Sequence, residues 1–264
     1  MYDNFGYKTK SMILRRLGSK KMIAEKIIPY FPEHNIYIEP FFGVGGLFFN
    51  KPKAKNNLLN DLDSDVFNFF IVIQNRKDEF LKAYYQMPVH SDLLNYWKLN
   101  LEIEPIKKAL RFVFLSNFTY LGHGDTIRMG VTDNSKKQLY LNIDKTFELI
   151  NNCIFSNFDF RKFFNSLIFK ESEKNRTFIY CDPPYLLTGN NYSNSFTEND
   201  SIDLFNCLEK IQCKWAMSEF DNEFILNQAK ERNLNITIIG DRSNLKNRRK
   251  EILITNYLKN NTLF

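Results

Sequence analysis

The stretch NIYIEPFFGVGGLFFN, residues 35–50, decides the fold. It begins with a short apolar segment, reaches the acid Glu39, and then passes through a glycine-rich turn into a second apolar segment. Glycine lets the backbone turn sharply and lets a ligand approach the main chain closely. A strand, a glycine turn and the start of a helix are therefore predicted, which is how a doubly wound α/β sheet begins.

The segments on both sides continue this pattern. Residues 20–31 place apolar side chains at helical spacing and predict an amphipathic helix, and residues 55–74 predict a second strand followed by a helix. Strands and helices alternate again in IFSNFDF, TFIYCDPPY, SIDLFNCLEKIQ, CKWAMSE, FDNEFILNQAKER, NITIIG and EILITNY. One α/β domain made of residues 1–75 and 153–264 is indicated.

A mostly helical insert, residues 76–152, interrupts that domain. Helical spacing runs through DEFLKAYYQM and SDLLNYWKLNLEIEPIKKALRFVFL. Near the end of the insert two short strands flank residues 132–136, and this arrangement predicts a β-hairpin.

Composition narrows the class of protein. With 264 residues, 44% of them hydrophobic, the chain can bury a sizeable core. No apolar run approaches the roughly 20 residues of a membrane helix, and no secretory signal stands at the N-terminus, so we expect a cytoplasmic protein without a membrane partner. Four cysteines and three histidines show no metal-ligand spacing, and no metal is expected.

The charge is unevenly placed. The net charge is +6; residues 1–30 hold seven Lys and Arg against two acids, and residues 241–250 hold five against one. Basic segments of this kind favour a polyanionic partner. Solvated charges at flexible ends are the equal alternative.

The glycine turn matches neither common phosphate-binding pattern. Phe48 stands where the dinucleotide fingerprint needs its last glycine, and the P-loop order is missing. Glu39 would repel a pyrophosphate but suits an amine or a sulfonium. Asp61, at the tip of the second strand, is placed to accept ribose hydroxyls. Asp63 and Asp65 are alternative ligands, or helix caps. Together these features indicate an adenosine-containing cofactor without a phosphate tail.

A second constellation is Asp182-Pro183-Pro184-Tyr185, which directly follows an apolar strand. The two proline rings fix φ and restrict the residues before them, so nearby carbonyl groups and the Asp182 carboxylate point in set directions. A planar amine could donate to Asp182 and to the Pro183 carbonyl while its ring stacks on Tyr185. A proline turn with a helix-capping Asp is the alternative.

The order EPFFGVGG, NDLDSD, FDF and YCDPPY resembles the alpha class of DNA adenine methyltransferases, relatives of the GATC-methylating enzymes. RRLGSKK, NSFTEND and KEILITNY extend the resemblance over most of the chain. It implies a Rossmann-like S-adenosylmethionine-dependent methyltransferase sheet whose insert is a target-recognition domain. It also implies the donor-site residues Arg16, Gly18, Lys20, Glu39, Phe41, Gly43, Gly45, Asp61, Asp159 and Phe160, although Asp159 could equally be a strand-end cap.

By the same resemblance, the reaction is methyl transfer to N6 of an adenine flipped out of duplex DNA. Asp182, Pro183, Pro184 and Tyr185 would hold the base, without metal or covalent intermediate. Expected DNA contacts are Asn117, Tyr120, Arg128, Lys136, Lys137, Lys246, Arg248 and Arg249, with Arg128 reading a guanine edge and the two insert lysines at the hairpin tip. They could also be ordinary solvated charges. Residues 117–123 depart from the relatives' pattern, so GATC specificity is not carried over.

Two other readings stay open. One is amino methylation of RNA adenine or of a protein amide, and the other is a catalytically silent DNA-binding protein. Asp at position 182 favours adenine in DNA as the target. All the expected reactive residues are present, which argues against a catalytically silent protein. We expect a monomer in solution; a role in restriction and modification stays open.

Overall fold

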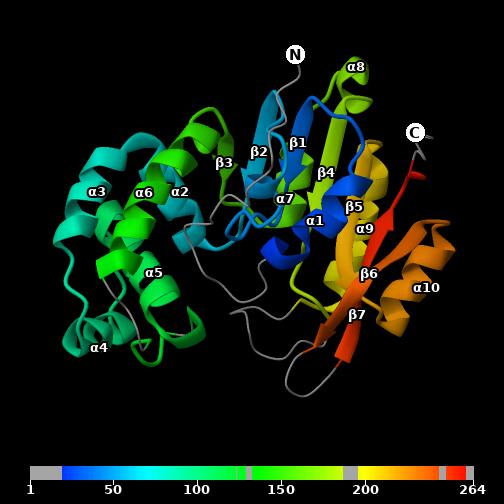
Figure 1. The fold of residues 1–264 in the computed structure, drawn as a ribbon. Coiled ribbons are helices and arrows are strands. Elements are labelled where there is room, and N and C mark those ends of the chain that lie inside the picture. Colours follow the sequence, from blue (N-terminus) through cyan, green and yellow to red (C-terminus); the bar gives the residue numbers. More distant parts are fainter. Residues whose placement is uncertain (1–19, 123, 129–132, 187–195, 244–247, 260–264) are drawn as a thin grey trace, which may run out of the picture. The chain divides into compact units, whose positions relative to one another are not determined.

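The computed structural model of the chain describes residues 20–122, 124–128, 133–186, 196–243 and 248–259 (Figure 1). The chain divides into two compact units, each described by itself. The helical unit comprises Met1–Met22, Gly43–Lys53 and Asp63–Phe155. The sheet unit comprises Ile23–Phe42, Ala54–Leu62 and Ser156–Phe264. The helical unit therefore takes in the predicted insert and also segments on its N-terminal side.

The predicted α/β sheet is confirmed, and within the described residues it has seven strands: β1 (Ile36–Glu39), β2 (Asn56–Asn60), β3 (Ile154–Ser156), β4 (Thr177–Cys181), β5 (Lys214–Phe220), β6 (Asn235–Ser243) and β7 (Arg248–Thr255). Their order is β3-β2-β1-β4-β5-β7-β6 (Figure 1). β1 lies parallel to β2 and β4, and β4 lies parallel to β5. β7 runs antiparallel to both of its neighbours. The chain thus builds a doubly wound, Rossmann-like sheet.

One face of the sheet is apolar. It carries Ile38, Ile179, Trp215, Met217, Ile252 and Ile254, alternate residues of their strands. The helices whose side chains cover this face are α7 (Phe160–Ser166), α9 (Glu198–Ile211) and α10 (Glu223–Glu231). α9 begins with a capping box between Thr197 and Asp200, and the residue that caps its C-terminal end, Gln212, has the left-handed conformation. Its apolar stripe supplies the centre of this core.

The opposite face carries aromatic and polar side chains. Phe31 packs against Phe178 and Tyr180, with ring centroids 4.6 and 5.4 Å away. Phe31 directly follows η1 (Lys20–Ile23), α1 (Ala24–Ile27) and η2 (Ile28–Tyr30). The helix predicted at 20–31 is therefore present only as a run of short turns, two of them 3-10 and one α-helical. The remaining short helix, α8 (Glu171–Lys174), precedes β4.

The helical unit contains α2 (Ser64–Asn75), α3 (Lys77–Gln86), α4 (Ser91–Leu99), α5 (Pro105–Phe118) and α6 (Asp133–Ile150), with the short turns η3 (Phe48–Asn50) and η4 (Tyr120–Gly122). Its core is aromatic. Phe69 contacts Phe80 and Phe112, both with ring centroids 5.8 Å away. The mostly helical character predicted for the insert is confirmed.

The predicted β-hairpin around residues 132–136 is wrong, because Asp133–Ile150 form the single helix α6. The sequence KKQLYLNI alternates like a strand over a few residues. Over the longer span, buried Leu139, Ile143, Thr146 and Ile150 recur every three or four residues. Helical periodicity over eighteen residues outweighs a short alternating run.

The helix expected after the glycine turn is only the three-residue η3. Lys51 follows it in an extended conformation, φ −105° and ψ 162°. Pro52 accounts for this, because the residue before a proline is pushed out of the helical region. Across the ranges that the structure describes, no helix is long and apolar enough to cross a membrane.

The core of the sheet unit gives the first prediction. Leu204 of α9 is fully buried, whereas Leu258 is 76% exposed. Leu204→Ala should lower the free energy of unfolding by about 2–5 kcal/mol, because it leaves a cavity. Leu258→Ala is the matched control and should change it by less than about 0.5 kcal/mol. Urea unfolding followed by circular dichroism measures both; equal losses would contradict the packing described for α9.

Candidate active site

The strand order reverses between β1 and β4, which lie side by side with Ile38 opposite Ile179. Both strands are parallel, so the residues after them leave the sheet at the same edge. These residues are Pro40-Phe41 after β1 and Asp182-Pro183-Pro184 after β4. Ligands of doubly wound sheets bind outside the carboxyl ends of the strands at this reversal. The structure therefore brings two of the predicted motifs together where a ligand site is expected.

Asn60, the last residue of β2, connects three strand ends. Its side-chain nitrogen donates to the carbonyl oxygens of Pro40 and Phe158, both at 2.9 Å. Its side-chain oxygen accepts from the Ser156 hydroxyl at 2.8 Å and from the Phe158 amide at 3.0 Å. Its own carbonyl accepts from the Phe42 amide at 2.9 Å. Asn60 was not among the residues predicted from the sequence, although its position directly before Asp61, the acid predicted to bind the ribose, was a usable signal.

Asp61 follows Asn60 and is half-buried. Its amide donates to the Ser156 carbonyl at 3.2 Å, and its carbonyl accepts from the Asn157 side chain at 2.7 Å. The main chain that carries the predicted ribose acid is thus held on both sides. The two alternatives have other roles: Asp63 caps α2 by accepting from the Asp65 amide, and Asp65 pairs with Arg111 at 3.3 Å.

Asp159 is the N-cap of α7, and its carboxylate accepts from the Arg161 amide at 2.9 Å. Its other oxygen lies 3.4 Å from the Arg161 guanidinium. That guanidinium also pairs with Asp200 and, at 2.7 Å, with Asp203 of α9. Asp159 therefore has a capping role in the structure, which was the alternative expected for it. A second role, contact with the adenine of the methyl donor, stays a prediction.

Three aromatic rings meet beyond the strand ends. Phe41 follows β1, Phe160 opens α7, and Phe196 precedes α9. Their centroids are 5.6 Å apart for Phe41 and Phe160, 5.8 Å for Phe160 and Phe196, and 6.1 Å for Phe41 and Phe196. Phe41 and Phe196 are half-buried, so this aromatic trio retains exposed apolar surface. Such a surface suits a planar ring. Phe196 was not among the predicted residues.

Glu39 is buried at the end of β1, where its carboxylate accepts from the Tyr37 hydroxyl at 2.9 Å. Burial, and then the Glu39 charge, raise the pKa of Tyr37 well above its usual value. Gly43 and Gly45, further along the chain, have φ of +53° and +73°. That left-handed conformation favours glycine, as the predicted turn requires.

The turn after β4 is partly exposed at Asp182 and Pro184 and buried at Pro183 and Tyr185. The Tyr185 hydroxyl donates to Glu251 of β7, and the Tyr185 ring packs edge-on against Phe220 with centroids 4.6 Å apart. Burial, and then the charges of Asp182 and Glu251, raise the pKa of Tyr185 well above its usual value. Tyr185 is therefore a protonated, firmly placed ring beside the Asp182 carboxylate.

The predicted DNA contacts of the insert differ in surroundings. Tyr120 is 60% exposed, Asn117 is buried in α5, and Lys137 is exposed on α6. Lys136 donates to the main-chain carbonyls of Tyr85, at 2.9 Å, and Met87. It therefore fixes the end of α3, and the hairpin tip assigned to it does not exist. Arg128 is half-buried, and its amide donates to the Phe118 carbonyl at 2.8 Å.

Other predicted residues lie at the ends of the chain. Arg16, Gly18 and Lys246 fall outside the described residues, as does the side chain of Arg248. Lys20 is buried in η1. Arg249, expected to meet DNA, is half-buried; its guanidinium contacts the Leu186 carbonyl at 3.5 Å and lies 5.6 Å from the Phe220 ring centroid.

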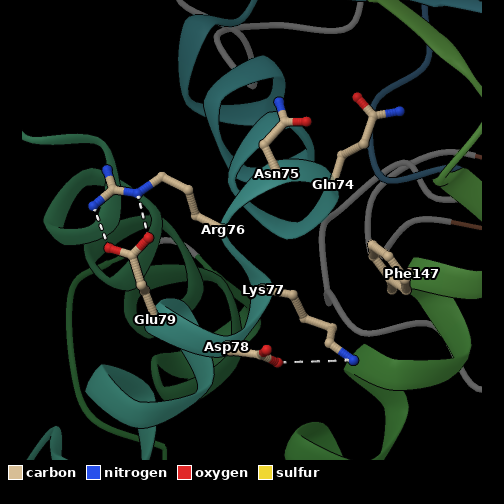
Figure 2. A pocket seen from close by; sticks show the side chains of 7 residues that line it. All are labelled: Gln74, Asn75, Arg76, Lys77, Asp78, Glu79 and Phe147. Atoms are coloured by element: carbon tan, nitrogen blue, oxygen red, sulfur yellow. Dashed lines mark hydrogen bonds and ion pairs between the residues drawn. The ribbon is translucent and has the colours of Figure 1, made fainter.

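A cavity of about 420 Å³ in the helical unit is lined by Gln74, Asn75, Arg76, Lys77, Asp78, Glu79 and Phe147 (Figure 2). Its cations are paired with acids: Arg76 with Glu79 at 2.6 Å, and Lys77 with Asp144 at 2.6 Å. Figure 2 shows Arg76 and Glu79 facing each other through two contacts. The cavity contains none of the predicted site residues and offers no surplus of positive charge to an anion.

Comparison with known proteins agrees with these motifs. The model of the family described as D12 class N6 adenine-specific DNA methyltransferase matches residues 17–245. The DNA adenine methylase of Salmonella typhi is 24% identical over 187 residues, covering 67% of this chain and 66% of that protein. The DNA adenine methylase of Haemophilus influenzae is 25% identical over 186 residues, covering 65% and 63%. The chain thus spans just under two thirds of the length of these relatives.

Similarity to solved structures is weaker. An rRNA methyltransferase from Streptomyces viridochromogenes aligns with a TM-score of 0.45 and 8% identity, over 96% of this chain and 94% of that one.

The acids around Arg161 give a pH prediction. Burial opposes ionisation of Asp200, but hydrogen bonds from Arg161 and Thr197 outweigh it and hold the pKa of Asp200 below its usual value. This stabilisation is present above the unfolded pKa of about 3.9 and is lost as pH falls through the lower folded pKa. Asp200→Asn should therefore lower the unfolding temperature, relative to the unmodified protein, by more at pH 7 than at pH 3. Glu198→Gln, in the same helical turn, is the control; a pH-independent effect of Asp200→Asn would contradict the pairing.

Proposed function

We propose that this chain, which belongs to the family of D12 class N6 adenine-specific DNA methyltransferases, transfers a methyl group from S-adenosylmethionine to the exocyclic amine of adenine in duplex DNA. One observation carries the proposal beyond the family match. The EPFFGVGG strand and the DPPY strand are neighbours at the point where the strand order reverses. A donor motif and an acceptor motif thus leave the sheet side by side.

The donor would be held by the ends of β1, β2 and β3. The Asp61 carboxylate would accept hydrogen bonds from the ribose hydroxyls. The hydrogen bonds to the main chain of Asp61 would hold the carboxylate in place for this. The aromatic trio would pack against the adenine ring, with Asp159 beside it. Glu39, Gly43 and Gly45 would adjoin the methionine part, as the family resemblance implies. S-adenosylmethionine, when bound, supplies the methyl group on a positively charged sulfur.

The target amine would be held by the turn after β4. The Asp182 carboxylate and the Pro183 carbonyl would each accept one hydrogen of the amine, which raises electron density on its nitrogen. Tyr185 would stack on the flipped base. Rate acceleration would come from holding nitrogen and methyl group in line and from the two fixed acceptors. The described residues of the turn offer carboxylate, carbonyl and aromatic groups, which suffice for a direct displacement. The bond from nitrogen to the methyl carbon would form as the bond from sulfur to that carbon breaks, the neutral thioether would leave, and the surplus amine proton would pass to the Asp182 carboxylate.

Residues 76–152 would read the DNA. Tyr120 is exposed there and Lys137 carries a charge at the surface of α6, so both are available to bases or phosphate. Lys136 would contribute less to DNA binding than the sequence predicts, because its ammonium group already donates hydrogen bonds to carbonyl oxygens.

The proposal is tested by incubating the purified full chain with S-adenosylmethionine labelled in the methyl group and unmethylated duplex DNA. We expect label in N6-methyladenine, identified after digestion to nucleosides. An RNA of the same sequence and a glutamine-containing peptide are parallel substrates. Label in either of these, with none in DNA, would overturn the proposal.

Asp182→Ala should abolish most transfer while leaving donor binding within about twofold. The expected loss in kcat is at least tenfold, which corresponds to about 1.4 kcal/mol. Asp182→Asn, which retains an acceptor oxygen, should lose less. Activity of Asp182→Ala within tenfold of the unmodified protein would remove Asp182 from the catalytic assignment.

Asp61→Ala should weaken donor affinity by about 10- to 100-fold, since hydrogen bonds to a charged group contribute roughly 1.5–3 kcal/mol. Titration calorimetry with S-adenosylmethionine measures this. Asp63→Ala is the matched control: it removes the α2 cap and should lower stability without changing donor affinity. The reverse result would transfer the ribose role to Asp63.

A further inference from the structure

The turn after β4, residues 182–185, is the proposed catalytic turn, and it contacts β7 through a buried hydrogen bond. Tyr185 is 8% exposed and Glu251 is 2% exposed, and the tyrosine hydroxyl donates directly to the Glu251 carboxylate. The two residues are 66 positions apart in sequence. Burying a carboxylate inside a sheet is costly unless hydrogen bonds compensate it. The position of Glu251 therefore calls for a reason beyond the stability of the strand.

The register of the sheet places Glu251 where it can act on Tyr185. Glu251 lies opposite Phe220 of β5, and the Phe220 ring packs edge-on against Tyr185 at 4.6 Å. The tyrosine is thus held at two points: its hydroxyl by Glu251 and its ring by Phe220. A ring held at both points cannot swing about its side-chain bonds without breaking one contact.

The main chain beyond Tyr185 is tied to the same strand. Arg249, two residues before Glu251 and thus on the same face of β7, contacts the Leu186 carbonyl at 3.5 Å. Its guanidinium also lies 5.6 Å from the Phe220 ring centroid. β7 therefore holds both the side chain of Tyr185 and the backbone of the next residue.

We propose that Glu251 is a positioning residue for methyl transfer: through its hydrogen bond it holds the Tyr185 ring in the orientation that receives the target base. This inference rests on the proposed function. A ring that is placed before the base arrives loses no side-chain freedom on binding, and it presents the base to Asp182 in one orientation. The role is indirect, because Glu251 acts through Tyr185.

A second buried tyrosine offers a matched control on the same sheet face. The Tyr180 hydroxyl bonds the Ser218 hydroxyl at 2.7 Å, between β4 and β5. Both residues are fully buried, and neither belongs to the catalytic turn. Ser218→Ala therefore removes a comparable buried partner of a tyrosine without touching Tyr185.

The test compares Glu251→Ala, Glu251→Gln, Tyr185→Phe, the double variant Tyr185→Phe/Glu251→Ala and Ser218→Ala in the full chain. Transfer of labelled methyl to unmethylated duplex DNA gives kcat and KM, and calorimetry gives the affinity for S-adenosylmethionine. We expect kcat of Glu251→Ala to fall at least tenfold with donor affinity within twofold. Glu251→Gln, which retains an acceptor oxygen, should recover most of the loss. Ser218→Ala should keep kcat within twofold.

The double variant separates positioning from a general loss of stability. If Glu251 acts through the Tyr185 hydroxyl, the double variant should be no more than twofold slower than the slower single variant. If the losses in kcat multiply in the double variant, the inference is overturned. It is also overturned if Glu251→Ala shows no loss and Glu251→Gln has the same kcat as Ser218→Ala. Either result leaves the proposed function intact. Absence of transfer to adenine by the unmodified protein would instead overturn the proposed function, and this inference with it.

Discussion

The candidate site depends on one side chain, the Asn60 amide. A side-chain amide has two donor hydrogens and an accepting oxygen, and Asn60 directs donors to two carbonyls and its oxygen toward two donors. These partners lie at or just after the ends of β1 and β3, close in sequence to Glu39 and to Asp159 at the start of α7, while Asn60 itself precedes Asp61. Because the amide is buried, a missing partner would leave a polar atom unsatisfied, which costs about 1–3 kcal/mol. The hydrogen bonds of Asn60 therefore help to fix the three strand ends relative to one another, in addition to the apolar packing around them.

The two faces of the sheet differ in role: one contributes mainly to stability, and the other carries residues of the candidate site. The face covered by α7, α9 and α10 is apolar and supplies the main core of the sheet unit. The opposite face buries three tyrosine hydroxyls, each with an oxygen partner: Tyr37 with Glu39, Tyr180 with Ser218, and Tyr185 with Glu251. The two buried acids of this face, Glu39 and Glu251, each accept a hydrogen bond from a tyrosine, Tyr37 and Tyr185, which offsets part of the cost of burying them. Two of these pairs include predicted site residues, Glu39 and Tyr185, so hydrogen bonds on this face hold parts of the candidate site in position.

The sequence predicted what depends on local pattern. The strands of the described residues were found because each is a short, largely apolar run bounded by turn residues, and the two ligand motifs were found because their residue types are unusual at strand ends. The α6 error has a local cause, since a few alternating residues masked a helical period marked by Leu139, Ile143 and Ile150. Asn60 and Glu251 were missed for another reason. Their partners lie up to 98 and 66 positions away, and no spacing within one segment encodes such pairs.

The stiffness of the DPPY turn illustrates the same limit. Proline rings fix φ at positions 183 and 184 and leave the turn's ends to be determined elsewhere. At one end, β4 pairs with β5 up to Cys181, opposite Met217, and so fixes the chain entering Asp182. At the other end, Glu251 fixes the Tyr185 hydroxyl and Arg249 contacts the following carbonyl. The middle of the turn is rigid through covalent geometry and its ends through the sheet, so the tetrapeptide alone does not set the direction of its acceptors. An isolated DPPY segment would have the stiffness of a proline turn without the orientation that two neighbouring strands impose.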